Sequence, residues 1–251
     1  MSEQNIFDDQ HFFDGYMELR GQEVNYNNSI EQPAMSKMLP PLNGKAVLDL
    51  GCGCGYNCTD FIKSGAKRVL GIDISEKMLD IAKTESCHPN IEYRKMSMTE
   101  ISSLDMKFDL VYSSLAFHYV EDFTKLMNDI YKLLNDNGTL LFSQEHPIKT
   151  ASPLLEGWNF DSDGKKASFT FTDYSESGPR KNRWIDTDYV KYHRTIGKIF
   201  TDIARAGFVI QEVCEPFPVP GSVEKRPAMA GEYIVPNFLI VKANKNTTAK
   251  E

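Results

Sequence analysis

Residues 47–57 read VLDLGCGCGYN, and this stretch decides the fold. An apolar run containing one carboxylate, Asp49, leads directly into a loop with three glycines, Gly51, Gly53 and Gly55. Glycine lacks a Cβ, so such a loop can turn sharply and let a ligand lie against its backbone. The free N–H groups of a following helix would face the same ligand. The stretch therefore predicts a buried strand, a ligand-binding turn and a helix in succession.

Short apolar runs alternate with amphipathic stretches on both sides of this loop. Helices are expected near residues 57–64, 75–85 and 122–134, with Ser75 as an N-cap and Asn137-Gly138 as a helix stop. Strands and helices that alternate in this way predict an α/β fold with a doubly wound, mostly parallel sheet. The strands are expected at residues 46–50, 68–73, 91–95, 108–113 and 139–143.

The pattern changes after residue 146. Residues 147–186 are polar and rich in glycine, and we expect them to form an inserted lid. A long amphipathic helix is expected over residues 187–206, followed by strands at 208–214 and about 233–241. The polar residues 244–251 are expected to form a frayed tail.

The composition favours small-molecule chemistry. The 251 residues include 28 basic and 35 acidic side chains, a net charge of −7, and no long basic cluster, so nucleic acid is not expected as a partner. No apolar run reaches the ~20 residues that span a bilayer, and residues 1–30 lack the features of a signal peptide. We therefore expect a cytoplasmic protein with no membrane partner, whose oligomeric state is open.

Three of the five cysteines, Cys52, Cys54 and Cys58, form a C-x-C-x3-C pattern within the glycine loop. No second cluster with the spacing of a zinc site follows. We expect these cysteines to fill the turn as small residues and expect no metal site.

An acidic residue, Asp73, follows Gly53 by 20 residues and ends the second expected strand. A carboxylate there could accept hydrogen bonds from the two hydroxyls of a ribose, so a nucleoside cofactor is expected. The dinucleotide pattern G-x-G-x-x-G is not met, because its third glycine would fall on Tyr56. Asp49 would repel a pyrophosphate but would suit an ammonium group. An NAD-dependent oxidoreductase is therefore disfavoured.

The conjunction of these motifs resembles the class I S-adenosylmethionine-dependent methyltransferases of the small-molecule type, which carry an LDLGCGxG motif. The resemblance covers residues 45–242. It implies a Rossmann-like, seven-stranded, mostly parallel sheet with an antiparallel last strand, and S-adenosylmethionine as cofactor. The glycines would hold its methionine part and Asp73 its ribose. The segments EHPI at 145–148 and YHRT at 192–195 are similar to those of an uncharacterised bacterial subgroup.

The resemblance also assigns the rest of the cofactor site. An acidic residue usually meets the adenine amino group in this family, whereas this chain has Ser97 between two methionines, with Glu100 displaced as an alternative. The backbone of residues 113–115 would face the methionine amine. The sequence SLAF at 114–117 replaces the N-P-P-Y of base-modifying enzymes. Besides the acids and glycines above, the expected cofactor residues are Tyr16, Arg20, Ile74, Met78, Ser97, Met98, Ser113, Ser114 and Leu115.

Methyl transfer requires alignment of nucleophile, methyl group and sulfur, and a general base only when the nucleophile carries a proton of high pKa. His118, Glu145 and His146 follow expected strands at the ligand-binding edge and are the catalytic candidates, with helix capping or a hydrogen-bonded turn as the alternative. Loops on a rigid scaffold carry specificity. The candidate substrate-binding residues are Tyr174, Arg180, Trp184 and His193, of which His193 would lie on the long helix.

We therefore expect a methyltransferase that acts on a small-molecule acceptor by in-line displacement. The alternative is a protein that binds the cofactor but has lost the chemistry. We expect a single domain over residues 1–251. Its parts are an N-terminal cover (1–44), a cofactor-binding core (45–146), the lid (147–186), a C-terminal helix and strands (187–243) and the tail (244–251).

Overall fold

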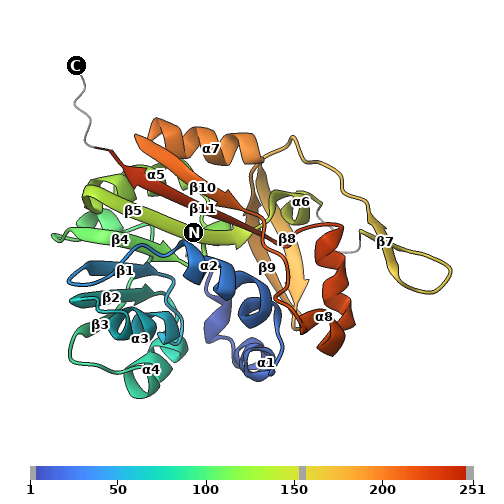
Figure 1. Cartoon of the computed structure of the whole chain (residues 1–251), viewed down its shortest axis with the longest axis horizontal. Coiled ribbons are helices and arrows are strands. Elements are labelled where there is room, and N and C mark those ends of the chain that lie inside the picture. The colour runs from blue at the N-terminus through green and yellow to red at the C-terminus, as the bar shows by residue number, and fades with distance from the viewer. Residues whose placement is uncertain (1–3, 153–156, 247–251) are drawn as a thin grey trace.

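The structure is a computed structural model that describes residues 4–152 and 157–246. Its centre is a seven-stranded sheet with the order β10-β11-β5-β4-β1-β2-β3 (Figure 1). All strands are parallel except β11, which is antiparallel to both of its neighbours. The fold is thus the Rossmann-like arrangement that the sequence predicts. The sheet strands are β1 (Ala46–Leu50), β2 (Arg68–Asp73), β3 (Ile91–Lys95), β4 (Phe108–Ser113), β5 (Leu134–Glu145), β10 (Phe208–Cys214) and β11 (Phe238–Lys245).

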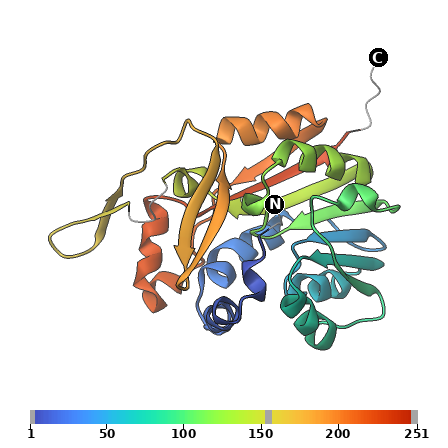
Figure 2. The same ribbon diagram turned by 180° about the vertical axis from the view of Figure 1, so that it is seen from behind.

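Helices cover both faces of the sheet. The apolar side chains of α5 and α7 pack on one face, and those of α2, α3 and α4 pack on the other. Both layers are visible in the two views (Figures 1 and 2). The helices are α1 (Gln10–Gly21), α2 (Gln32–Met38), α3 (Tyr56–Lys63), α4 (Glu76–Glu85), α5 (Phe123–Leu133), α6 (Pro147–Ala151), α7 (Ile196–Arg205) and α8 (Ser222–Lys225).

Two antiparallel hairpins lie between α6 and α7 in the chain. The first joins β6 (Trp158–Phe160) to β7 (Lys166–Phe169), and the second joins β8 (Gly178–Trp184) to β9 (Thr187–His193). Helix α1 and the second hairpin lie together at the end of the sheet where the parallel strands terminate (Figures 1 and 2).

The expected long helix over residues 187–206 is wrong in its first half. Residues 187–193 form β9, and the helix begins only after Thr195, whose side chain accepts a hydrogen bond from Lys198 N–H. The sequence TDYVKYH alternates, and its buried residues Tyr189, Lys191 and His193 recur at every second position. Period 2 with β-branched and aromatic residues is typical of a strand, so this stretch was assigned the wrong period.

Three boundaries also differ from expectation. Helix α5 ends at Leu133, and Asn137, with a φ of 59°, lies in an irregular part of β5 where the register against β4 shifts. Residues 227–233 form the 3-10 helix η5 (Pro227–Tyr233), so β11 begins five residues later than expected. Within the expected tail, Asn244 is paired in β11, and residues 247–251 lie outside the described residues.

In the described part of the chain, no helix combines the length and apolar character that crossing a membrane requires.

Candidate active site

The glycine loop joins β1 to α3 at the carboxyl edge of the parallel strands. Gly51, Gly53 and Gly55 have φ values of 73°, 52° and 77°, a region that residues with a Cβ rarely adopt. A Cβ on Gly55 would lie 2.2 Å from the Tyr93 hydroxyl, whereas one on Gly53 would meet nothing within 4 Å. The outer glycines therefore allow close packing, while the space beside Gly53 is open to a ligand.

The Asp73 carboxylate lies behind this loop. Its two oxygens accept hydrogen bonds of 2.9 Å from the backbone N–H groups of Gly53 and Ser75. Burial raises the pKa of Asp73, although these hydrogen bonds oppose the rise. Each carboxylate oxygen can accept more than one hydrogen bond, so Asp73 retains acceptors for ribose hydroxyls.

Asp49 is the buried carboxylate of β1, with 1% of its surface exposed. Its Oδ2 accepts a hydrogen bond of 3.4 Å from the Cys58 thiol, while no described atom donates to Oδ1. Burial raises the pKa of Asp49 to about 7. A buried oxygen without a donor is costly, and the ammonium group of a cofactor methionine would supply one. The residues present thus fit the group that the sequence predicts.

The cysteines of the loop are free and buried, as fillers of the turn. Cys54 Sγ lies 3.9 Å from the sulfur of Met17 in α1 and 3.5 Å from that of Met78 in α4. In the described residues, no group of three or more His, Cys, Asp or Glu side chains is arranged to hold a metal ion.

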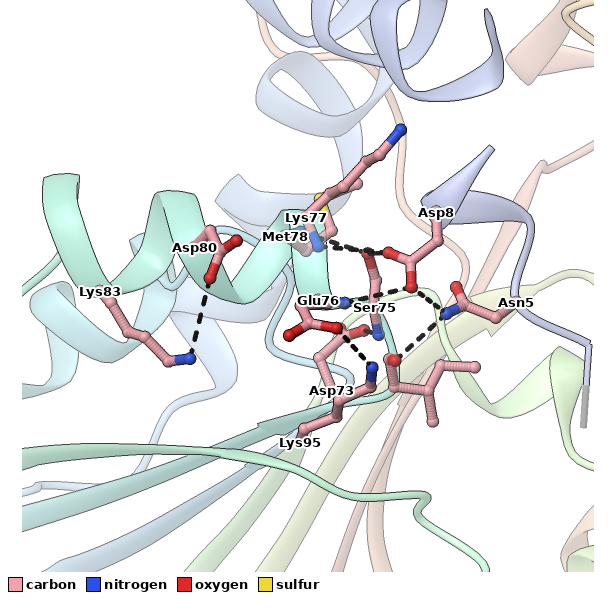
Figure 3. Close-up of polar contacts among 11 residues, drawn as sticks. Asn5, Asp8, Asp73, Ser75, Glu76, Lys77, Met78, Asp80, Lys83 and Lys95 are labelled. Atoms are coloured by element: carbon pink, nitrogen blue, oxygen red, sulfur yellow. Dashed lines mark hydrogen bonds and ion pairs between the residues drawn. The ribbon is translucent and has the colours of Figure 1, made fainter. Parts of the chain in front are cut away.

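The N-terminal segment is fastened to the same edge (Figure 3). Asp8 accepts hydrogen bonds from the Ser75 hydroxyl at 2.7 Å and from Lys77 N–H at 3.2 Å, at the first turn of α4. Ser75 is the N-cap that the sequence predicts, since its side chain accepts from Met78 N–H. Asn5 donates both to Asp8 and to the carbonyl of Ile74. This network holds the start of α1 beside the expected ribose site.

Tyr16 and Arg20 lie on α1, which reaches the glycine loop through the contact of Met17 with Cys54. Burial raises the pKa of Tyr16, and the charges of Arg20, Asp73 and Glu31 all act on its hydroxyl. The tyrosine ring also packs edge-to-face on Trp184 of the second hairpin, with ring centroids 6.0 Å apart. The N-terminal segment and the second hairpin therefore meet at Tyr16.

Sequence reasoning missed Glu31, which lies in a single π-helical turn at Asn27–Glu31 and is fully buried. Its Oε1 accepts hydrogen bonds from the hydroxyls of Ser143 at 2.5 Å and Ser114 at 2.8 Å. Burial raises its pKa, which these hydrogen bonds oppose. An isolated glutamate in a polar run gave no signal in the sequence, because its serine partners lie 83 and 112 residues away.

The loop after β4 is shaped by backbone hydrogen bonds. The buried Ser113 hydroxyl donates to the carbonyl of Leu50 at 2.7 Å. Leu115 adopts a φ of 54°, and its N–H donates to the carbonyl and hydroxyl oxygens of Ser143. This loop therefore lies directly against both β1 and β5, where the resemblance places the methionine amine.

The expected adenine residues lie around the ends of β2 and β3. Met78 is buried against Cys54, and the methyl group of Met98 would be 3.4 Å from a Cβ on Gly51. Ser97 is buried, and its hydroxyl lies 2.7 Å from the Thr99 hydroxyl and accepts from Thr99 N–H. Ser97 is thus engaged in its own turn, and the displaced Glu100 is exposed.

His118, Glu145 and Lys191 form a charged cluster at the ends of β4, β5 and β9. His118 Nε2 lies 3.7 Å from Glu145 Oε1, and the Lys191 ammonium is paired with Glu145 Oε2. Burial lowers the pKa of His118 to about 4, so its ring is neutral at pH 7. Burial also raises the pKa of Glu145, but the paired Lys191 ammonium more than offsets this, and the carboxyl stays ionised.

Lys191 is 1% exposed, and nothing in the sequence singled it out while residues 187–206 were expected to form a helix. The strand periodicity of β9 was the signal that could have identified it.

His146 occupies a different environment from its neighbour Glu145. Its Nδ1 accepts from Ile148 N–H at 3.2 Å, which caps α6, and its Nε2 lies 2.9 Å from Glu215 Oε1. Both ring nitrogens are thus engaged at the base of the lid.

The expected substrate residues divide between two places. His193 is buried, with Nδ1 at 2.8 Å from the Thr150 hydroxyl and Nε2 donating to the Tyr174 carbonyl. Arg180 donates to the carbonyls of Ala151, Asp173 and Glu176. These contacts join the second hairpin to α6 and to the segment around Tyr174. Trp184 instead lies over α1, as described above.

Comparisons with known proteins agree with this geometry. The family described as "Methyltransferase domain" matches residues 48–142. A protein of Haemophilus influenzae is 36% identical over 218 residues, which cover 84% of this chain and 86% of that protein.

Two solved structures are similar over most of the chain. The crystal structure of an S-adenosylmethionine-dependent methyltransferase from Mesorhizobium loti has a TM-score of 0.77 and 38% identity, covering 85% of this chain and 97% of that one. A structure from Listeria monocytogenes has the same TM-score and coverage at 36% identity. With its glycine loop, its two strand-end carboxylates and these relatives, the chain belongs to the class I S-adenosylmethionine-dependent methyltransferases.

Proposed function

We propose that this methyltransferase acts on a small-molecule acceptor and that its covers close around that acceptor. The support is the pair of covers at one edge, where α1 and the β8–β9 hairpin meet through Tyr16 and Trp184. A charge of −7 and the sequence SLAF, in place of a base-binding motif, disfavour nucleic acid. The chain would then act as one domain, with residues 1–44 and 147–186 as covers on the core.

The cofactor would lie along the carboxyl ends of β1, β2 and β4. Its methionine part would pass over Gly53, with the ammonium group toward Asp49, and its ribose would bind Asp73. When bound, S-adenosylmethionine supplies an electrophilic methyl group on a sulfonium. The observation that carries this placement is the open space at Gly53 between the buried carboxylate of Asp49 and the half-buried carboxylate of Asp73.

Glu145 is the group best placed to orient the acceptor and to take up its proton. His118 Nδ1 accepts from Glu145 N–H at 3.4 Å, so its other nitrogen carries the hydrogen and faces the Glu145 carboxylate. Lys191 favours the ionised form of that carboxylate. We therefore assign Glu145 the contact with the acceptor, and His118 and Lys191 its positioning. His146, engaged with Glu215, would orient the base of the lid.

Isothermal titration with S-adenosylhomocysteine tests the cofactor site. We expect binding by the wild type and at least ~30-fold weaker binding by Asp73→Ala, because two hydrogen bonds to a charged group are lost. Asp60→Ala, at an exposed position of α3, is the matched control and should bind as the wild type does. Absence of binding by the wild type, or equal binding by Asp73→Ala, would contradict the proposal.

A second experiment tests the chemistry. Once turnover is found with a panel of small hydroxyl, amine and thiol acceptors, Glu145→Gln should lower kcat while leaving S-adenosylhomocysteine binding unchanged. An unaltered kcat would remove Glu145 from the reaction.

A further inference from the structure

Two lysines outside the cluster described above converge on one indole ring. The Nζ atoms of Lys149 in α6 and Lys166 in β7 lie 4.8 Å and 4.3 Å from the centre of the Trp158 ring. Lys149 also lies 4.2 Å from the centre of the Phe169 ring. Trp158 and Phe169 are cross-strand partners in the first hairpin, packed edge-to-face at 5.1 Å. The ring faces stabilise both ammonium groups but supply no counter-ion.

In the part of the chain that the structure describes, the lysines at this place outnumber the carboxylates that act on them most strongly. Lys166 donates a hydrogen bond to the carbonyl of Ala228, and among the described residues neither lysine forms an ion pair. Among the described carboxylates, Glu232 acts most strongly on both lysines, but its oxygens accept from the backbone N–H of Asn237 at 3.0 Å and from its side chain at 2.5 Å. Of the groups that the structure describes, Glu232 is therefore the main counter-charge of the two ammonium groups, and Glu232 is already hydrogen-bonded to Asn237.

The charges around Lys149 act in both directions. Burial lowers its pKa to about 8; Lys166 and Lys191 also lower it, while Glu232 and Glu145 raise it. Burial raises the pKa of Glu232 to about 7, which weakens it further as a counter-ion. An anion between the lysines would relieve this imbalance.

The lysine pair adjoins the proposed acceptor site. Lys149 follows Glu145 by four residues, on the helix that leaves β5 at the carboxyl edge, and the charges of Glu145 and Lys191 act on it. The pair is also packed against η5, since a Cβ on Gly231 would lie 2.9 Å from Lys166 Cδ and 3.0 Å from the Trp158 ring. The charges of Lys149 and Glu145 act on each other, which suits a single acceptor molecule that contacts both.

We propose that the methyl acceptor carries an anionic group, a carboxylate or phosphate, and that Lys149 and Lys166 bind this group beneath the first hairpin. This inference rests on the proposed function, whose acceptor it narrows to small organic anions. Lys149 contacts two ring faces and has no hydrogen-bond acceptor among the described residues, so it provides most of the selectivity, and Lys166 adds charge.

The experiment compares three probes of similar shape by isothermal titration: benzoate, phenyl phosphate and uncharged benzamide. Each is titrated into the full chain with and without S-adenosylhomocysteine. We expect at least one anion to bind ~10-fold or more tightly than benzamide. Lys149→Met should reduce this preference to less than ~3-fold, whereas Lys149→Arg should retain it. Lys165→Met, at the exposed neighbouring position of the same hairpin, is the matched control and should behave as the wild type.

The outcomes separate the two proposals. Failure of S-adenosylhomocysteine to bind would overturn the proposed cofactor site, whatever the anions do. Cofactor binding together with equal or absent binding of the anions and benzamide would overturn only the anion site. A preference that persists in Lys149→Met would also overturn it. The relative strength of benzoate and phenyl phosphate would tell a carboxylate acceptor from a phosphorylated one.

Discussion

The proposed cofactor half and the proposed acceptor half of the carboxyl edge differ in the kind of interaction that forms them. The cofactor half depends on backbone: three glycines with positive φ, and N–H groups that bind Asp73 within a span of about 25 residues. The acceptor half depends on side chains that are distant in sequence, such as Lys191 and Glu145, 46 residues apart, and His146 and Glu215, 69 residues apart.

The backbone-based half is the kind of feature that a family can share, whereas the side-chain-based half can be specific to this chain. A site formed by backbone groups tolerates few substitutions, so it can be recognised as a sequence motif. A cluster of side chains on separate elements can change one residue at a time, and so can select a different acceptor on the same scaffold. Each of the following predictions tests one side of this comparison, in order of decreasing effect.

Gly55→Ala should disrupt the backbone cradle. A Cβ there combines left-handed strain with a position 2.2 Å from the Tyr93 hydroxyl, and we expect a loss of about 4 kcal/mol in the free energy of unfolding. Gly44→Ala is the control, because its φ of 72° is nearly the same but its Cβ would meet no atom. Urea unfolding measures both. Equal losses would mean that strain alone, and not packing on Tyr93, requires Gly55.

Lys191→Met should loosen the acceptor half. It leaves the carboxylate of Glu145, which is 24% exposed, without its buried partner. We expect a loss of about 3 kcal/mol in the free energy of unfolding. The double variant Lys191→Met/Glu145→Gln should regain most of this, because no unpaired charge remains. Lys63→Met, which breaks an exposed ion pair with Asp60, should change the urea midpoint little. A double variant no more stable than the single one would show that the charge of Glu145 is not the cause.

Asp49 should give stability and cofactor binding opposite dependences on pH. Its folded pKa of about 7 lies above the ~3.9 of an unfolded aspartate, so its contribution to stability is present at low pH and is lost as the pH rises through 7. The free energy of unfolding of the cofactor-free protein should fall by ~2 kcal/mol between pH 5 and pH 8 because of this group. Asp49→Asn should abolish that part of the slope.

Affinity for S-adenosylmethionine should instead increase over the same pH range, since its ammonium group prefers the ionised carboxylate. Chemical unfolding and calorimetry at matched pH values measure the two effects. Identical stability profiles of the wild type and Asp49→Asn would contradict the assignment.

Asp8→Ala should weaken the attachment of the N-terminal segment, because Asp8 loses its hydrogen bonds to the N-terminus of α4. We expect the free energy of unfolding to fall by about 1 kcal/mol. Burial raises the pKa of Asp8, but hydrogen bonds led by Ser75 lower it overall, so its contribution is present above about pH 4 and is lost as the pH falls below that value. Hydrogen exchange over residues 5–21 should increase. Asp80→Ala, at an exposed position of α4, should leave that exchange unchanged.

The core strands and the cofactor carboxylates were predictable because each depends on neighbours in sequence. The pattern around Gly53 and the capping of α4 by Ser75 use contacts of three residues or fewer, or the fixed spacing of one strand-helix-strand unit. The expectation for residues 187–206 was wrong because TDYVKYH has few residues and a polar composition. Its alternation is present in the sequence, and its pairing with β8 shows that it forms a strand.

The sequence by itself determined the fold, the cofactor class and the positions of Asp49, Asp73 and the three glycines. The physical reason is that the backbone conformation and the parallel sheet topology depend on the local periodicity of apolar residues and on the positions of the glycines. Only the tertiary structure decided that Glu31, Lys191 and Lys149 face the same edge, because the groups that bind or act on each of them come from distant parts of the chain. Those contacts, and not the motif, define where the acceptor would bind.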